Sequence, residues 1–204
     1  MSGQVYTLEF QNNSTNAGDV CVYQTPPDVN TPGVMSLAWF SQFNYPTTEV
    51  VFKWTIDYSF VWSQTGVLKP GVIFDASQTW EADLHTSNQV TFHYDQAYTF
   101  QGQKAGPQAG NLYITEDPTI PLKTASVGIG MSGAGVFAVQ AQPNINLVFT
   151  PHPLYWITFG KFVPGQVLDI QSLTGVAQVQ FPPNIYKMAA ILNEDNTWTI
   201  EPLK

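Results

Sequence analysis

The chain has 204 residues, of which 44% are hydrophobic and only 11% are charged. It carries seven lysines, no arginine and a formal net charge of −8, so we expect neither nucleic acid nor an anionic membrane as a partner. With 13 Phe, 9 Tyr and 6 Trp, the chain is too rich in aromatic residues for a disordered protein and long enough to bury a full core.

Short alternating segments open the chain. Val5–Phe10 and Val20–Gln24 predict strands, and residues 34–43 fit either a short helix or a strand. From Val50 to Trp62 an apolar residue occupies every second position and the other face is mostly polar, which predicts one continuous strand. Its core-facing residues would be Phe52, Trp54, Ile56, Tyr58, Phe60 and Trp62.

Shorter strand patterns fill the rest of the sequence. They cover residues 89–94, 98–100, 112–115, 126–131, 136–140, 146–150, 155–159, 166–170, 176–181, 188–192 and 197–200. Fifteen prolines and fifteen glycines, spread throughout, argue against long helices. The pattern predicts an all-β fold with little helix, an antiparallel β-sandwich or jelly roll, formed as a single domain over residues 1–204.

Residues 128–133 read Gly-Ile-Gly-Met-Ser-Gly, a match to the dinucleotide-binding glycine motif. The context differs from that motif, because residues 134–139 alternate like a strand and the next acidic residue is Asp169. We therefore predict a tight hairpin between two strands, in which glycines permit a positive φ or close packing.

Cys21 is the only cysteine, so the chain cannot form an internal disulfide. The N-terminal residues lack the pattern of a secretory signal, and no apolar run is long enough to cross a membrane. We expect no membrane span and a cytoplasmic location, with non-classical release as an alternative.

Two Asp/His pairs are candidates for a metal or acid–base site. Asp83 and His85 share one strand face, as do His93 and Asp95, so a hairpin between the two segments would bring four ligand-type side chains together. A turn at residues 87–88 would instead place His85 opposite Val90. The alternative is that both histidines lie on a polar sheet surface, and we expect no cofactor unless a divalent metal binds here.

Aromatic residues supply the candidate ligand site. His152 lies between two prolines that stiffen the backbone, and Tyr155 and Trp156 follow directly, with their side chains on opposite faces of a strand. Trp39 is the second candidate. Exposed rings of this kind stack on sugar faces, while neutral polar side chains bond to hydroxyl groups.

Several segments together resemble the RhiA-type proteins, small acidic bacterial proteins expressed in the rhizosphere. They are residues 11–15 (QNNST), 20–25 (VCVYQT), 35–40 (MSLAWF), 54–62 (WTIDYSFVW), 127–133 (VGIGMSG) and 146–153 (NLVFTPHP). The resemblance implies cell-density-regulated expression and a role in plant–microbe interaction. It implies no reaction and carries over no catalytic residue.

We expect non-catalytic, lectin-like recognition of a neutral, hydroxyl-rich ligand such as a glycan. One alternative is a jelly-roll enzyme that uses the Asp/His group. The other is a self-assembling structural protein, because low charge and many strands favour association into a homo-oligomer.

Overall fold

The computed structural model describes residues 3–26 and 31–203, which form strands and turns without any helix. The prediction of an all-β fold is confirmed. The strands are β1 (Val5–Asn12), β2 (Gly18–Gln24), β3 (Met35–Ser36), β4 (Phe40–Asn44), β5 (Glu49–Thr55), β6 (Tyr58–Ser63), β7 (Gln78–Ala82), β8 (Gln89–Asp95), β9 (Ala97–Lys104), β10 (Leu112–Glu116), β11 (Ser126–Met131), β12 (Ala134–Gln140), β13 (Ile145–Phe149), β14 (Tyr155–Gly160), β15 (Ala177–Val179), β16 (Lys187–Leu192) and β17 (Trp198–Pro202).

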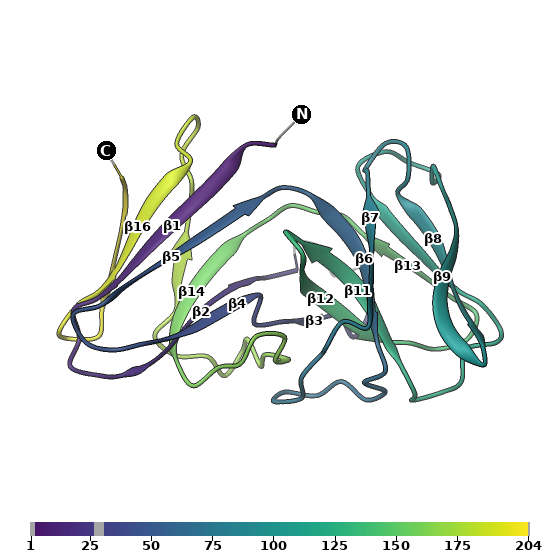
Figure 1. Ribbon diagram of the computed structural model, residues 1–204, viewed down its shortest axis with the longest axis horizontal. Coiled ribbons are helices and arrows are strands. Elements are labelled where there is room, and N and C mark those ends of the chain that lie inside the picture. The colour runs from purple at the N-terminus through teal and green to yellow at the C-terminus, as the bar shows by residue number, and fades with distance from the viewer. Residues whose placement is uncertain (1–2, 27–30, 204) are drawn as a thin grey trace.

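These strands assemble into four sheets. Sheet A has the order β17-β16-β1-β5, sheet B β15-β14-β2-β4, sheet C β3-β12-β11-β6-β7 and sheet D β13-β10-β8-β9. Neighbouring strands are antiparallel except β1 with β16 and β8 with β10. Sheets A and B lie together at one end of the molecule, and sheets C and D at the other (Figure 1).

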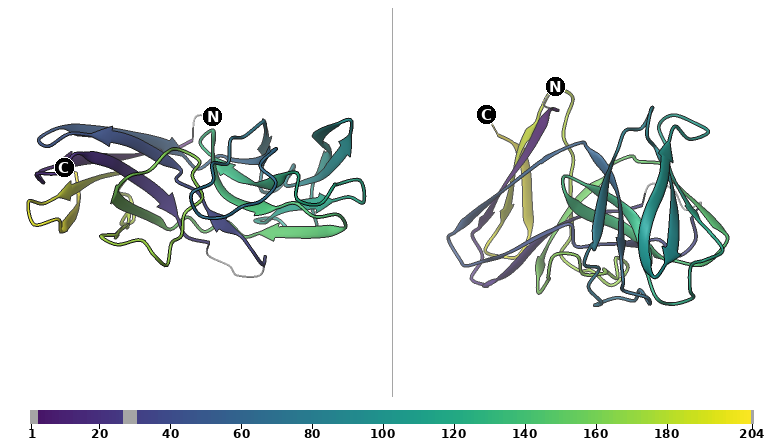
Figure 2. Two further views of the ribbon diagram at one scale, coloured as in Figure 1. Left: turned by 90° about the horizontal axis from the view of Figure 1, so that it is seen from below. Right: turned by 45° about the vertical axis from the view of Figure 1, so that its right-hand side comes forward.

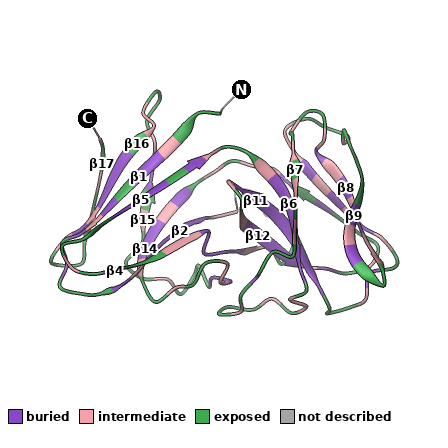
Figure 3. Ribbon diagram, viewed as in Figure 1, coloured by how far each residue is buried: buried purple, intermediate pink, exposed green. Residues whose placement is uncertain are grey.

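Aromatic contacts pair the sheets face to face. Trp54 of sheet A contacts Tyr155 of sheet B with ring centroids 5.0 Å apart, and Trp62 of sheet C contacts Phe92 of sheet D at 5.9 Å. Two sandwiches therefore lie side by side along the long axis (Figure 2). The buried residues lie mainly in the strands (Figure 3), and one hydrophobic cluster includes residues from all four sheets.

The segment Val50–Trp62 differs from the prediction of one continuous strand. β5 ends at Thr55 and β6 begins at Tyr58, so the chain leaves sheet A and enters sheet C, and Ile56 between them is 46% exposed. Buried and exposed residues alternate along β5, whereas in β6 every residue from Ser59 to Ser63 is buried, so both faces of β6 are covered. Periodicity predicted the facing of the strands but could not show that the chain changes sheets.

The glycine-rich segment forms the predicted hairpin. β11 and β12 are joined by Ser132 and Gly133, whose φ values of 52° and 77° suit a two-residue turn. Gly128 lies within the ladder, where an added Cβ would lie 1.9 Å from the carbonyl oxygen of Phe137. This glycine is therefore required for close packing of adjacent strands.

Two strand assignments were wrong. β7 was not predicted, because Trp80 is its one large apolar residue and none of its residues is fully buried. Residues 166–170 form no strand; Gln166 and Val167 make only isolated bridges. No helix in the described part of the chain is long and apolar enough to cross a membrane.

Candidate ligand-binding site

The predicted ligand residues do not form an exposed patch. Trp39 is 1% exposed and donates its indole N–H to the carbonyl oxygen of Met131 at 2.8 Å. Tyr155 is 6% exposed, and its ring stacks against Trp39 with centroids 6.0 Å apart. The structure therefore brings these two residues together inside the core.

Trp156 and His152 lie elsewhere. Trp156 points to the opposite face of β14, as predicted, but residues including Phe162 and Leu168 cover that face and leave the ring half-buried. Its indole N–H donates to the Thr25 hydroxyl at 3.2 Å. His152 is exposed. The four predicted residues thus occupy different environments.

Tyr155 belongs to an aromatic cluster at one end of the sandwich of sheets A and B. β1 begins here, β5 ends here, and β14 begins opposite them. Tyr6 stacks on its cross-strand partner Trp54, with centroids 6.1 Å apart and an angle of 11° between the rings. Phe181 meets Tyr6 edge-on at 5.1 Å and Tyr155 at 5.8 Å. Such contacts fix the rings rigidly in place.

Two polar atoms in this cluster lack a protein partner. Both the Tyr155 hydroxyl and the Trp54 indole nitrogen are buried without a well-formed hydrogen bond. Burial raises the pKa of the Tyr155 phenol well above its ordinary value, and the neighbouring Trp54 indole opposes this rise without cancelling it. The hydroxyl is therefore neutral at physiological pH and has unused capacity to donate and accept.

A pocket of about 210 Å³ opens at this cluster. Its lining residues carry no charge; they are Tyr6, Ile56, Pro153, Leu154, Tyr155, Gln178, Val179, Gln180 and Phe181. The glutamine side chains supply both donors and acceptors at the rim, while the rings supply apolar faces. A small neutral molecule with hydroxyl groups fits this chemistry better than an ion does.

A larger pocket, of about 480 Å³, lies at the opposite end of the same sandwich. It is also uncharged and includes Asn16, Phe159, Thr174 and Asn196. The Asn16 side chain already donates to the Asn196 side chain at 2.9 Å. None of its lining side chains is among the buried polar groups without a partner, so the pocket beside Tyr155 is the stronger candidate.

The four predicted metal ligands do not converge. Asp83 lies in the turn after β7, where its carboxylate accepts hydrogen bonds from the backbone N–H groups of His85 and Thr86, both at 2.9 Å. These bonds lower the pKa of the Asp83 carboxyl. β8, which carries His93 and Asp95, pairs with β9 and β10 instead of with the segment around His85. No cluster of three or more metal-ligating side chains occurs in residues 3–26 and 31–203.

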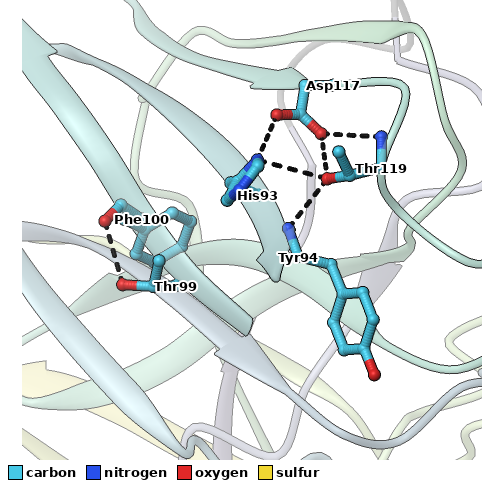
Figure 4. Close-up of polar contacts among 6 residues, drawn as sticks. All are labelled: His93, Tyr94, Thr99, Phe100, Asp117 and Thr119. Atoms are coloured by element: carbon cyan, nitrogen blue, oxygen red, sulfur yellow. Dashed lines mark hydrogen bonds and ion pairs between the residues drawn. The ribbon is translucent and has the colours of Figure 1, made fainter. Parts of the chain in front are cut away.

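His93 has a different acidic partner. Its Nδ1 donates to the Asp117 carboxylate at 2.5 Å, and the Thr119 hydroxyl lies 3.2 Å from the same nitrogen (Figure 4). Thr119 also donates to Asp117 from its hydroxyl and its backbone N–H, and accepts from the backbone N–H of Tyr94 at 2.9 Å. The group ties the end of β8 to the loop after β10.

Electrostatics favour the ionised form of Asp117. Partial burial raises the pKa of its carboxyl, but the hydrogen bonds from Thr119 and His93 outweigh burial and lower the pKa overall. The Asp117 carboxylate accepts hydrogen bonds from His93 and from the hydroxyl and backbone N–H of Thr119. These contacts give the group a structural role, because they hold the loop after β10 against the end of β8.

The comparisons with known proteins bear on the family of this chain. A family model described as RhiA matches residues 3–202. The chain belongs to the RhiA family. "Protein RhiA" of Rhizobium leguminosarum bv. viciae is 38% identical over 203 residues, which cover 98% of this chain and 87% of that protein. The resemblance noted from the sequence is thus confirmed, and no solved structure matches the chain.

For this member of the RhiA family, sequence patterns missed most of the pocket. Tyr6 shares its strand face with the buried residues Leu8 and Phe10, so it had the pattern of a core residue. The other lining residues lie far from Tyr155 in the sequence: they are Gln178, Gln180 and Phe181. The pairing of β15 with β14 brings them beside Tyr155. No local motif marks such an arrangement.

Proposed function

We propose that this protein binds a neutral, hydroxyl-bearing small molecule or glycan terminus in the pocket beside Tyr155, without catalysis. The observation that supports the proposal most is that Tyr155 lines the pocket while its buried hydroxyl has no well-formed hydrogen bond to protein. An unsatisfied buried hydroxyl costs free energy, and a ligand hydroxyl that bonds to it would recover that cost. The setting is the plant–microbe interaction that the family resemblance implies.

The lining chemistry supports the same class of ligand. Tyr6 and Phe181 offer ring faces for the apolar side of a sugar, while Gln178 and Gln180 reach its hydroxyl groups from the rim. No lysine lines the pocket, so an anion would lack a counter-charge. A volume of about 210 Å³ suits one small ring or one terminal residue of a longer glycan.

A glycan array followed by calorimetry tests this proposal. We expect saturable binding of at least one neutral glycan, weakened by Gln180→Leu, which keeps the size of the side chain and removes its amide. Asn196→Leu at the opposite pocket is the matched control and should bind like the unmodified protein. Loss of binding in Asn196→Leu alone would place the ligand in the opposite pocket and contradict the proposal. An array without any bound glycan would contradict it as well.

A further inference from the structure

A third pocket, on the other sandwich, has the opposite electrostatic character. It has a volume of about 460 Å³ and lies at the start of β6 and the end of β7 in sheet C. Its lining includes two carboxylates, Asp57 and Glu81, and two hydroxyl groups, Ser59 and Thr79. No lysine or histidine lines it. This pocket is separate from the one beside Tyr155 and plays no part in the proposed glycan recognition.

Strand pairing places the polar side chains on one face. Ser59 pairs directly with Glu81, and Val61 pairs with Thr79, in the antiparallel ladder between β6 and β7. Directly opposed residues point to the same side of a sheet, with Cβ atoms about 5 Å apart. Ser59, Glu81 and Thr79 therefore share one face, and Asp57 precedes Ser59 by two residues.

The floor of the pocket carries a polar atom without a partner. Ser59 is 5% exposed, and its hydroxyl has no hydrogen bond to protein. On the neighbouring strand β11, Gly130 is directly opposite Ser59, and an added Cβ there would lie 2.7 Å from the Ser59 oxygen. A side chain at this position would therefore press against the Ser59 hydroxyl, and glycine avoids that contact.

Neither carboxylate is neutralised by a cation. Asp57 accepts a hydrogen bond from the backbone N–H of Ser132 at 2.8 Å through one oxygen. Among the residues that the structure describes, the one ion pair is that of His93 with Asp117, so neither Asp57 nor Glu81 is paired with a lysine. Two unpaired carboxylates on a protein of net charge −8 attract cations and repel anions.

We infer that this pocket binds an organic ammonium ion, a primary amine on a small molecule. An ammonium group has three N–H donors, and the pocket offers matching acceptors in Asp57, Glu81 and the Ser59 hydroxyl. The space is far larger than a bare metal ion needs, and no group of three metal-ligating side chains lies within residues 3–26 or 31–203. Charge-assisted hydrogen bonds are the strong contacts in such a site.

Calorimetry with 1,4-diaminobutane tests the inference. We expect saturable binding of the diamine that weakens at high salt, and no binding of 1,4-butanediol, which has the same chain length without the charge. Glu81→Gln should weaken diamine binding about tenfold or more, because it removes one charged acceptor. Ser59→Ala should weaken it less, and it tests the unpartnered hydroxyl directly.

The control removes the same charge far from the pocket. Glu49 is exposed on β5 of the other sandwich, so Glu49→Gln should bind the diamine like the unmodified protein. Equal weakening by Glu49→Gln and Glu81→Gln would mean diffuse attraction to the acidic surface and would overturn the inference. So would the absence of saturable diamine binding, or displacement of the diamine by an equal concentration of calcium.

Discussion

Trp54 and Tyr155 face each other across the sandwich of sheets A and B, with ring centroids 5.0 Å apart, and each buries a polar atom without a well-formed hydrogen bond. Trp54 is the next-to-last residue of β5, just before the chain crosses to sheet C, and Tyr155 is the first residue of β14. The contact therefore joins the structural centre of this sandwich to the wall of the proposed ligand pocket. A substitution that removes only the polar atom tests recognition, and a substitution that removes the whole ring tests packing.

Removing the Trp54 ring tests its packing role. Trp54→Ala should lower the free energy of unfolding by about 3–5 kcal/mol, because it leaves a cavity among Tyr6, Trp39 and Tyr155. Denaturant unfolding measures the change. Trp80 is half-buried on an edge strand, so Trp80→Ala is a milder control. A cost below about 1 kcal/mol for Trp54→Ala would mean that the core does not depend on this ring.

The buried carboxyl group of Glu116 should make the free energy of unfolding depend on pH. It is 1% exposed, one of its oxygens has no partner, and burial raises the pKa of its carboxyl to about 7 despite a hydrogen bond from the backbone N–H of Gln142. The unfolded chain releases this proton near its ordinary pKa of 4.5. Between those values the folded state holds the extra proton, so stability should fall as pH rises from about 4.5 to 7.

Glu116→Gln isolates this effect. The substitution should remove the fall between those pH values, which we expect to be of the order of 3 kcal/mol in the unmodified protein. Urea unfolding across the pH range measures it, and the exposed Glu194→Gln is the charge-matched control. An unchanged pH profile in Glu116→Gln would show that Glu116 is ionised at no extra cost in the folded protein.

Asp117 should act in the opposite direction. Because its folded pKa lies below the ordinary value, its contribution to stability is present above about pH 4 and is lost as the pH falls through the folded pKa. Asp117→Asn should cost about 1 kcal/mol at neutral pH, by weakening the bonds to His93 and Thr119. Glycan binding should be unaffected. Altered binding in this variant would point to a functional site at His93.

The hairpin glycines differ in what they tolerate. At Gly133 φ is 77° and nothing lies within 4 Å of an added Cβ, so Gly133→Ala should cost about 1 kcal/mol from backbone strain alone. Gly128→Ala should be much worse, because its Cβ would lie 1.9 Å from the Phe137 carbonyl oxygen. Thermal unfolding compares the two, and equal costs would contradict the packing role of Gly128.

Local patterns predicted the strands better than their assembly. The alternation in Val50–Trp62 gave the buried face of β5 correctly, but the step from sheet A to sheet C at Ile56, and the burial of both faces of β6, are tertiary features that a period of two cannot reveal. The same limit applies to β7, whose exposed side chains give a weak pattern.

The candidate site shows the limit most clearly. Residue type and the rigid proline-flanked loop drew attention to Tyr155, which does line a pocket. Sequence could not show that the Tyr155 ring would be enclosed by Tyr6 and Phe181, because those contacts join segments far apart in the chain. Asp117 was missed as the partner of His93 for the same reason.

The Tyr155 hydroxyl allows the most direct test, because binding and stability should respond to its loss in opposite ways. Tyr98 is a matched control: it is 8% exposed in the other sandwich, and its hydroxyl is hydrogen-bonded to Thr124. Tyr98→Phe should lose about 1 kcal/mol of stability and keep ligand binding. Tyr155→Phe should keep its stability or gain some, because the hydroxyl it removes has no partner.

The decisive measurement is calorimetric titration of a glycan selected from the array into Tyr155→Phe, Tyr98→Phe and the unmodified protein. We predict that Tyr155→Phe alone binds about tenfold more weakly or worse, while remaining at least as stable as the unmodified protein. Equal affinity for all three proteins would contradict the proposal that the unpartnered Tyr155 hydroxyl recognises the ligand.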